Sequence, residues 1–302
     1  MRGNAGITIN SLDDLVILMF LEPDEKPPTG LFSKLIHYAV LYAQPHPAMA
    51  HVELYVPSEV VGLGGYRPPH FATYNSEGEV AGWRNAGDGY YRDNIGKFRA
   101  VPFVSTGIGR ACLRACNSCC GAPYSLSRYL TTVPIFRAFA RLFGESPKSP
   151  AHCAVLTTRV IKMAAPSDAN SIFPGRPSTY GPSRTYLAAQ DFVQRRGVCV
   201  GNSFDNHVAL DAIKILGGGT DAEVLRLDTA SVDMAIRGMA AAVYTAPHTN
   251  TRQAQSDLAA ALIRLSYTRH DAAVSSDVVT DSETRSDSSL DMSVHLLSVE
   301  HT

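Results

Sequence analysis

The residue of this sequence best suited to covalent chemistry is Cys153, in the stretch "SPAHCAVLTTRVIK". It follows a proline and opens an apolar run with helical spacing, so we predict that it lies in the first turn of a helix. The start of a helix lowers the pKa of a thiol through the helix dipole, and it presents backbone N–H groups that can bind an oxyanion. Cys153 is therefore a candidate nucleophile.

A thiol nucleophile needs a base that takes its proton, and two histidines are candidates. His152 is adjacent to Cys153, but neighbouring side chains at a helix start point in different directions, so we interpret His152 as a neighbour that tunes or shields the thiol. His51 opens the strand-like stretch "HVELYVP", whose alternation places His51, Glu53 and Tyr55 on one face. We predict that His51 is the base and that a polar residue on the next strand orients it.

The elements that position these residues are short strands and helices that are segregated along the chain. A buried strand is predicted at Leu15–Leu21, a helix at 31–43, paired strands at 51–57 and 70–83, and a further strand at 96–105. Since strands and helices do not alternate regularly, the predicted fold class is α+β.

Six cysteines, four of them within "ACLRACNSCC", raise the possibility of a zinc knuckle. Structural zinc normally takes ligand pairs from separate turns, whereas this stretch has a helical pattern that aligns Cys112, Cys116 and Cys119 on one face. We therefore interpret these residues as buried thiols and expect no metal and no cofactor, with zinc as the alternative.

The composition is that of an ordinary globular chain of 302 residues, with 45% hydrophobic residues and a formal charge of -1. It gives no broad basic field, which argues against a nucleic-acid partner. The apolar run Leu15–Leu21 is far shorter than the ~20 residues that span a bilayer, and no basic leader with a cleavage site precedes it. We therefore expect no integral membrane contact and a reducing, cytoplasmic location.

Several stretches between about residues 13 and 163 together resemble the circularly permuted branch of the NlpC/P60 superfamily of papain-like cysteine hydrolases. They are "LFSKLIHYAVLYA", "AHVELYVPSE", "HFATYNSEGEV", "APYSLSRYL" and "AHCAVLTTRVIK". In that branch the histidine strand precedes the cysteine helix, as it does here. The resemblance implies a permuted papain-like fold, in which a small antiparallel sheet packs against helices, with Cys153 as nucleophile and His51 as general base.

The resemblance also places a third catalytic residue in "TYNSEG". We choose Asn75, whose amide oxygen can accept from the imidazole, and keep Glu77 and Ser76 as alternatives because a register slip would reverse their faces. Tyr124, in "GAPYSL", and His152 are candidates for the cleft or for oxyanion binding.

The function that the resemblance implies is hydrolysis of an amide, peptide, isopeptide or thioester bond, with a protein or peptide as the substrate. The motifs look like those of divergent members that large viruses encode, which would place the protein in the host cytoplasm or in the virion. A catalytically degenerate fold that serves as a structural or protein-binding component is one alternative. A lipid acyl hydrolase or acyltransferase is another.

Three regions are predicted along the chain. Residues 1–200 form the catalytic domain, and residues 201–265 form a helical C-terminal extension. The Ser- and Asp-rich tail at 266–302 has few large apolar residues and is expected to be disordered.

Overall fold

The computed structural model describes residues 6–24, 30, 34, 38, 45–57, 68–73, 80–84, 89–125, 128, 132, 145–247 and 250–285, with side chains described up to residue 275. The helix predicted at 31–43 lies outside these residues, apart from Lys34 and Tyr38, which are helical.

A five-stranded antiparallel sheet lies at the centre of the fold, in the order β5-β4-β3-β2-β6. Its strands are β2 (Leu15–Leu21), β3 (His51–Tyr55), β4 (His70–Ala72), β5 (Gly82–Arg84) and β6 (Phe98–Val104). The predicted strand at Leu15–Leu21 is confirmed. β2 is a continuous apolar run because both of its faces are buried from Leu15 to Phe20.

The pairing of β3 with the next strand is confirmed, with Tyr55 opposite His70. The single strand expected over 70–83 is corrected to two strands, β4 and β5, which pair with each other. The sequence between them contains Asn, Ser and Gly, residue types that are depleted in strands. The predicted strand at 96–105 is observed as β6.

Helices surround the sheet, and a short parallel pair of strands, β1 (Ile7–Ile9) and β7 (Val198–Val200), lies beside it. The α-helices are α2 (Tyr90–Asp93), α3 (Ile108–Cys119), α4 (Cys153–Ala164), α5 (Pro166–Ile172), α6 (Pro182–Arg195), α7 (Asn206–Gly218), α8 (Asp221–Arg226), α9 (Thr229–Thr245) and α10 (Thr251–Arg285). Single 3-10 turns are η1 (Leu12–Asp14), η3 (Ile95–Lys97) and η6 (Pro177–Thr179). The described residues thus form a mixed α+β fold.

Aromatic contacts fix how α6 lies on the sheet. Phe20 of β2 meets Tyr186 of α6 edge to face at 5.1 Å, and Phe103 of β6 stacks on Phe192 at 5.3 Å.

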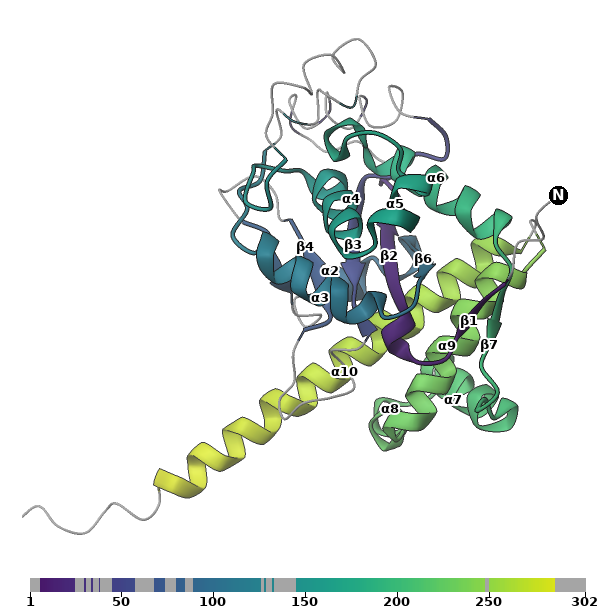
Figure 1. Ribbon diagram of the computed structural model, residues 1–302. Coiled ribbons are helices and arrows are strands. Elements are labelled where there is room, and N and C mark those ends of the chain that lie inside the picture. Colours follow the sequence, from purple (N-terminus) through teal and green to yellow (C-terminus); the bar gives the residue numbers. More distant parts are fainter. Residues whose placement is uncertain are drawn as a thin grey trace, which may run out of the picture.

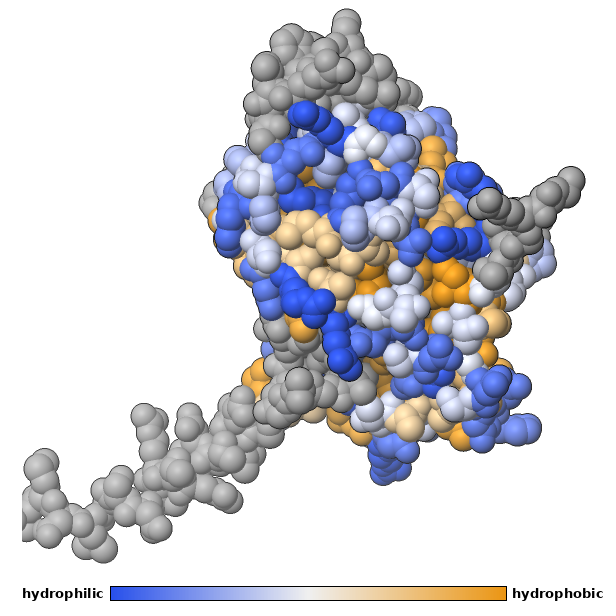
Figure 2. Space-filling model, in the orientation of Figure 1, coloured by the Kyte–Doolittle hydropathy of each residue, from blue (hydrophilic) through white to orange (hydrophobic). Residues whose placement is uncertain are grey.

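α3 packs against α4, and α4 packs on β3 (Figure 1). The surface has mixed polarity, with a pale apolar area near α3 bordered by hydrophilic residues (Figure 2).

The cysteine-rich stretch forms the helix that the spacing predicts. Cys112, Cys116 and Cys119 lie on the inner face of α3 and are fully buried, so they serve as small packing residues. Burial raises the pKa of the Cys112 thiol. Among the described residues, no group of three or more His, Cys, Asp or Glu side chains is arranged to hold a metal ion.

The apolar core is continuous across the boundary predicted at 200/201. Val224 of α8, Ile236 of α9 and Leu258 of α10 belong to the same cluster as Leu18 of β2. α10 packs against both β6 and α9, and Figure 1 shows its C-terminal part projecting from the body. The helical extension therefore shares a core with the sheet.

The predicted start of the disordered tail, at residue 266, falls inside α10. Ser266 and Thr268 are buried, and the Ser266 hydroxyl donates to the carbonyl of Leu262 at 2.7 Å. Tyr267 lies under the guanidinium of Arg92, 4.2 Å from the ring centroid. Tertiary contacts thus extend the helix through a stretch whose composition alone predicts disorder, while residues 286–302 lie outside the described part of the chain.

Candidate active site

Cys153 is the first residue of α4, as its sequence context predicts. His152 is the N-cap residue, with an extended backbone (φ -93°, ψ 174°), and its carbonyl accepts from the N–H of Leu156. The first-turn N–H groups of an α-helix have no acceptor within the helix. α4 is buried from Cys153 to Ile161, so core packing holds the helix that carries the thiol in a fixed position.

The sheet brings His51 to this thiol. His51 is the first residue of β3, the strand against which α4 packs, and its imidazole is near enough to the Cys153 thiol for each group to shift the pKa of the other. The Cys153 side chain is 5% exposed, and that of His51 is 21% exposed. Two residues about a hundred positions apart in the sequence therefore meet at a site that is shielded but still open on the histidine side.

The electrostatics of this pair favour a thiolate beside an imidazolium. Burial by itself raises the pKa of the Cys153 thiol, but the charge of His51 and the further interactions with His152 and His51 outweigh it and lower the pKa to about 5. For His51, burial lowers the pKa, whereas Cys153 and then Glu53 raise it, with a net rise above 6.5. The ion pair is therefore present from about pH 5 to above pH 6.5.

His152 interacts more directly with the thiol than its position suggests. Adjacent side chains on a helix diverge, but His152 is a cap residue with an extended backbone and lies outside the helical register. Its fully buried ring helps to lower the pKa of the Cys153 thiol.

Glu53 is a part of the site that the sequence reasoning did not select. It is 1% exposed, and its Oε2 lies 3.9 Å from Nε2 of His51. His70 of β4 and the hydroxyl of Tyr91 in α2 both contact the same carboxylate. The alternation of side chains along β3 places Glu53 on the same face as His51, and this pattern in the sequence could have identified Glu53 as a part of the site.

The three residues proposed for the orienting role, Asn75, Ser76 and Glu77, lie outside the described residues. Tyr124 is described and forms an isolated bridge with Ala151, two residues before the nucleophile. Burial, with the nearby Cys153 thiolate, raises the pKa of Tyr124 to about 12. Tyr124 therefore lies near the thiol and keeps its phenolic proton at neutral pH.

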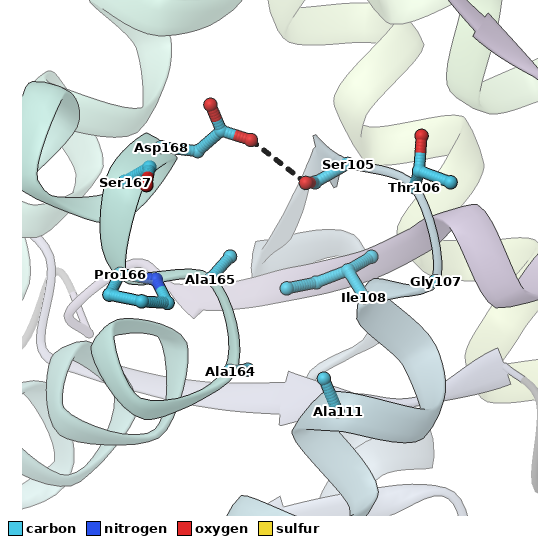
Figure 3. Close-up of a pocket in the computed structure, with 10 residues that line it drawn as sticks. All are labelled: Ser105, Thr106, Gly107, Ile108, Ala111, Ala164, Ala165, Pro166, Ser167 and Asp168. Atoms are coloured by element: carbon cyan, nitrogen blue, oxygen red, sulfur yellow. Dashed lines mark hydrogen bonds between the residues drawn. The ribbon is translucent and has the colours of Figure 1, made fainter.

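A surface hollow lies at the other end of α4 (Figure 3). Ala164 and Ala165 line it together with Ser105, whose hydroxyl donates to Asp168 at 2.8 Å. The first and last residues of α4 are about 16 Å apart along the helix axis. None of the residues selected from the sequence lines this hollow, so it is separate from the thiol site.

Comparison with protein-family models, with curated proteins and with solved structures finds no match to this chain. Within the described part of the chain, no helix combines the length and the apolar character that crossing a bilayer requires.

Proposed function

We propose that this protein is a cysteine hydrolase of the circularly permuted papain-like, NlpC/P60 type. The observation that carries the proposal is the electrostatic interaction between Cys153, at the first residue of a buried helix, and His51, at the first residue of a strand. The chain order, with the histidine strand before the cysteine helix, agrees with that branch. Either residue alone is commonly structural, whereas a thiol whose pKa is lowered by a neighbouring imidazole is typical of an activated nucleophile.

The proposed reaction is acyl transfer to the thiol. The Cys153 thiolate attacks the carbonyl carbon, a C–S bond forms, and first-turn N–H groups of α4 bind the resulting oxyanion. As the bond between the substrate's carbonyl carbon and its leaving group breaks, His51 gives its proton to the leaving amine or thiol. His51 then takes a proton from water as the water oxygen attacks the thioester carbonyl, the C–S bond breaks, and the acid leaves with Cys153 restored as a thiolate beside the protonated His51.

The proposed substrate is a peptide or isopeptide of a protein, and the proposed location is the cytoplasm, of the host if the protein is viral. The reaction needs a reduced thiol, which a reducing compartment preserves. All six cysteines are free in the structure, which supports this assignment.

An acyl donor that needs no specificity pocket tests the proposal. With p-nitrophenyl acetate we expect an acetyl adduct on Cys153 in the mass spectrum and release of more than one p-nitrophenolate per protein. His51→Ala should lower the rate by about 100-fold or more, because the base is lost. Cys199→Ala is the matched control, since Cys199 is exposed on β7, and it should leave the rate unchanged.

Two outcomes would overturn the proposal. If Cys153→Ala reacts as fast as the wild type, the thiol is not the nucleophile. If the adduct forms once and is never hydrolysed, the fold is degenerate and serves as a binding or structural component.

A further inference from the structure

The carboxylate of Glu53 is buried in the middle of the sheet, with 1% of its side chain exposed. A buried carboxylate is costly unless its oxygens accept hydrogen bonds or meet a positive charge. The described contacts of Glu53 come from three elements, and none of them is a lysine or an arginine. The position of this group therefore calls for an explanation beyond packing.

Both carboxylate oxygens have fixed partners. Nδ1 of His70 lies 2.8 Å from Oε1, and the hydroxyl of Tyr91 donates to Oε2 at 3.0 Å. Two contacts on two oxygens set the plane of the carboxylate as well as its position. In this orientation Oε2 faces Nε2 of His51 at 3.9 Å.

The two supporting residues are themselves held by packing. The His70 ring is fully buried, lies 4.3 Å from the Tyr91 ring and meets Tyr55 edge to face at 5.0 Å. Tyr91 stacks on Phe98 of β6 at 5.9 Å. Within the described residues Nε2 of His70 has no hydrogen-bond partner, so an Nδ1–H tautomer that donates to Glu53 leaves no buried donor unsatisfied.

We propose that Glu53 is the positioning residue of the thiol site: held by His70 and Tyr91, it orients His51 toward Cys153 and stabilises the imidazolium. The inference rests on the proposed function. It assigns the role of orienting His51 to a residue of β3 itself, whereas the sequence predicts Asn75 for this role. A carboxylate at this distance acts through His51 and does not touch the reacting atoms.

Within the part of the chain that the structure describes, the following titratable groups surround this pair. On the His51 side they are Cys153 and Glu53, and Glu53 in turn meets His70 and Tyr91. On the Cys153 side they are His152 and Tyr124. Because Glu53 raises the pKa of His51, removing its charge should lower the pH at which the imidazolium loses its proton.

The test is the pH dependence of Cys153 alkylation by iodoacetamide, followed by mass spectrometry of the Cys153 peptide. The profile should rise near pH 5, where the thiolate forms, and change again where His51 deprotonates. Glu53→Gln keeps the shape of the side chain and removes its charge. We expect the second transition to move down by about one pH unit in this variant, because an opposite charge at such a distance shifts a pKa by at least about that much.

A matched pair at position 70 separates positioning from packing. His70→Asn keeps a donor where Nδ1 lies, whereas His70→Leu removes it, and both lose the ring. We expect His70→Leu to shift the second transition in the same direction as Glu53→Gln, and His70→Asn to shift it less. In the Glu53→Gln background, His70→Leu should add no further shift, because His70 acts through Glu53.

The inference is overturned if Glu53→Gln leaves the second transition in place. It is also overturned if His70→Leu shifts that transition as much in the Glu53→Gln variant as it does in the wild type. Failure of the proposed function looks different, because the wild type would then show no transition near pH 5 and His51→Ala would not change the profile. Circular dichroism of each variant checks that the fold is intact.

Discussion

At the scale of single residues, the site works because the buried Cys153 thiolate and the partly exposed His51 imidazolium stabilise each other. Burial alone opposes both the Cys153 thiolate and the His51 imidazolium, and each group lowers that cost for the other. The pair is therefore strongly coupled, and its two pH transitions belong to the pair as a whole. Replacing one partner should change the titration of the other.

His152 is the second histidine that lowers the pKa of the Cys153 thiol, and a substitution at this position tests its effect. His152→Asn keeps a residue type that caps helices well and removes the imidazole that helps to lower the pKa of Cys153. Because the interaction with that imidazole lowers the pKa of Cys153, we expect the acid transition of the alkylation profile to move up from pH 5 by about one unit.

The alkaline transition of the same profile reports on His51 and should change less. An acid transition that stays at pH 5 or falls would show that His152 has no part in stabilising the thiolate. Arg195→Ala, an exposed change on α6, is a suitable control that should leave both transitions in place.

At the scale of elements, local sequence patterns predict the parts that position the thiol and its base. The apolar run of β2, the alternation of β3 and the proline before α4 are all short-range signals, and each predicted element is observed. The helical face of cysteines in α3 is also a local pattern. These elements follow from the sequence because their neighbours along the chain determine them.

The parts of the site that the sequence did not predict are non-local. Glu53 could be placed on the face of His51, but its contacts with His70 and Tyr91 depend on β4 and α2 meeting β3 in space. The break of the 70–83 stretch into β4 and β5 likewise depends on pairing within the sheet. Composition and periodicity do not contain these distances.

At the scale of the whole molecule, one core joins the site to the C-terminal helices. Among the described residues of α10, four large aliphatic side chains are fully buried, at Leu258, Leu262, Ile263 and Leu265. It packs on β6, which is paired with β2, the neighbour of the histidine strand. The extension therefore supports the sheet that carries His51.

Truncation tests this dependence. A chain that ends at residue 250 loses these four side chains, each of which contributes about 1.5–3 kcal/mol when fully buried. Their sum is comparable with the whole stability of a typical domain, so we expect the shortened chain to lose its cooperative thermal unfolding transition.

A chain that ends at residue 275 is the matched control. It keeps every buried side chain that the structure describes on α10, so we expect its melting temperature to stay close to that of the full chain. If the chain ending at residue 250 unfolds cooperatively at the temperature of the full chain, the helical extension is an independent unit.

The central claim is that Cys153 is a thiolate activated by His51, and the most direct measurement is its alkylation rate by iodoacetamide at pH 5.5. With a pKa of about 5, Cys153 is mostly thiolate at this pH, whereas an ordinary thiol of pKa about 8.5 is about 0.1% thiolate. The weaker nucleophilicity of a low-pKa thiolate offsets part of this difference and leaves an advantage on the order of tenfold.

We therefore predict that Cys153 reacts on the order of tenfold faster than the exposed Cys199 at pH 5.5, and that His51→Ala removes this advantage. A Cys153 that reacts no faster than Cys199, at a rate that His51→Ala leaves unchanged, would contradict the claim.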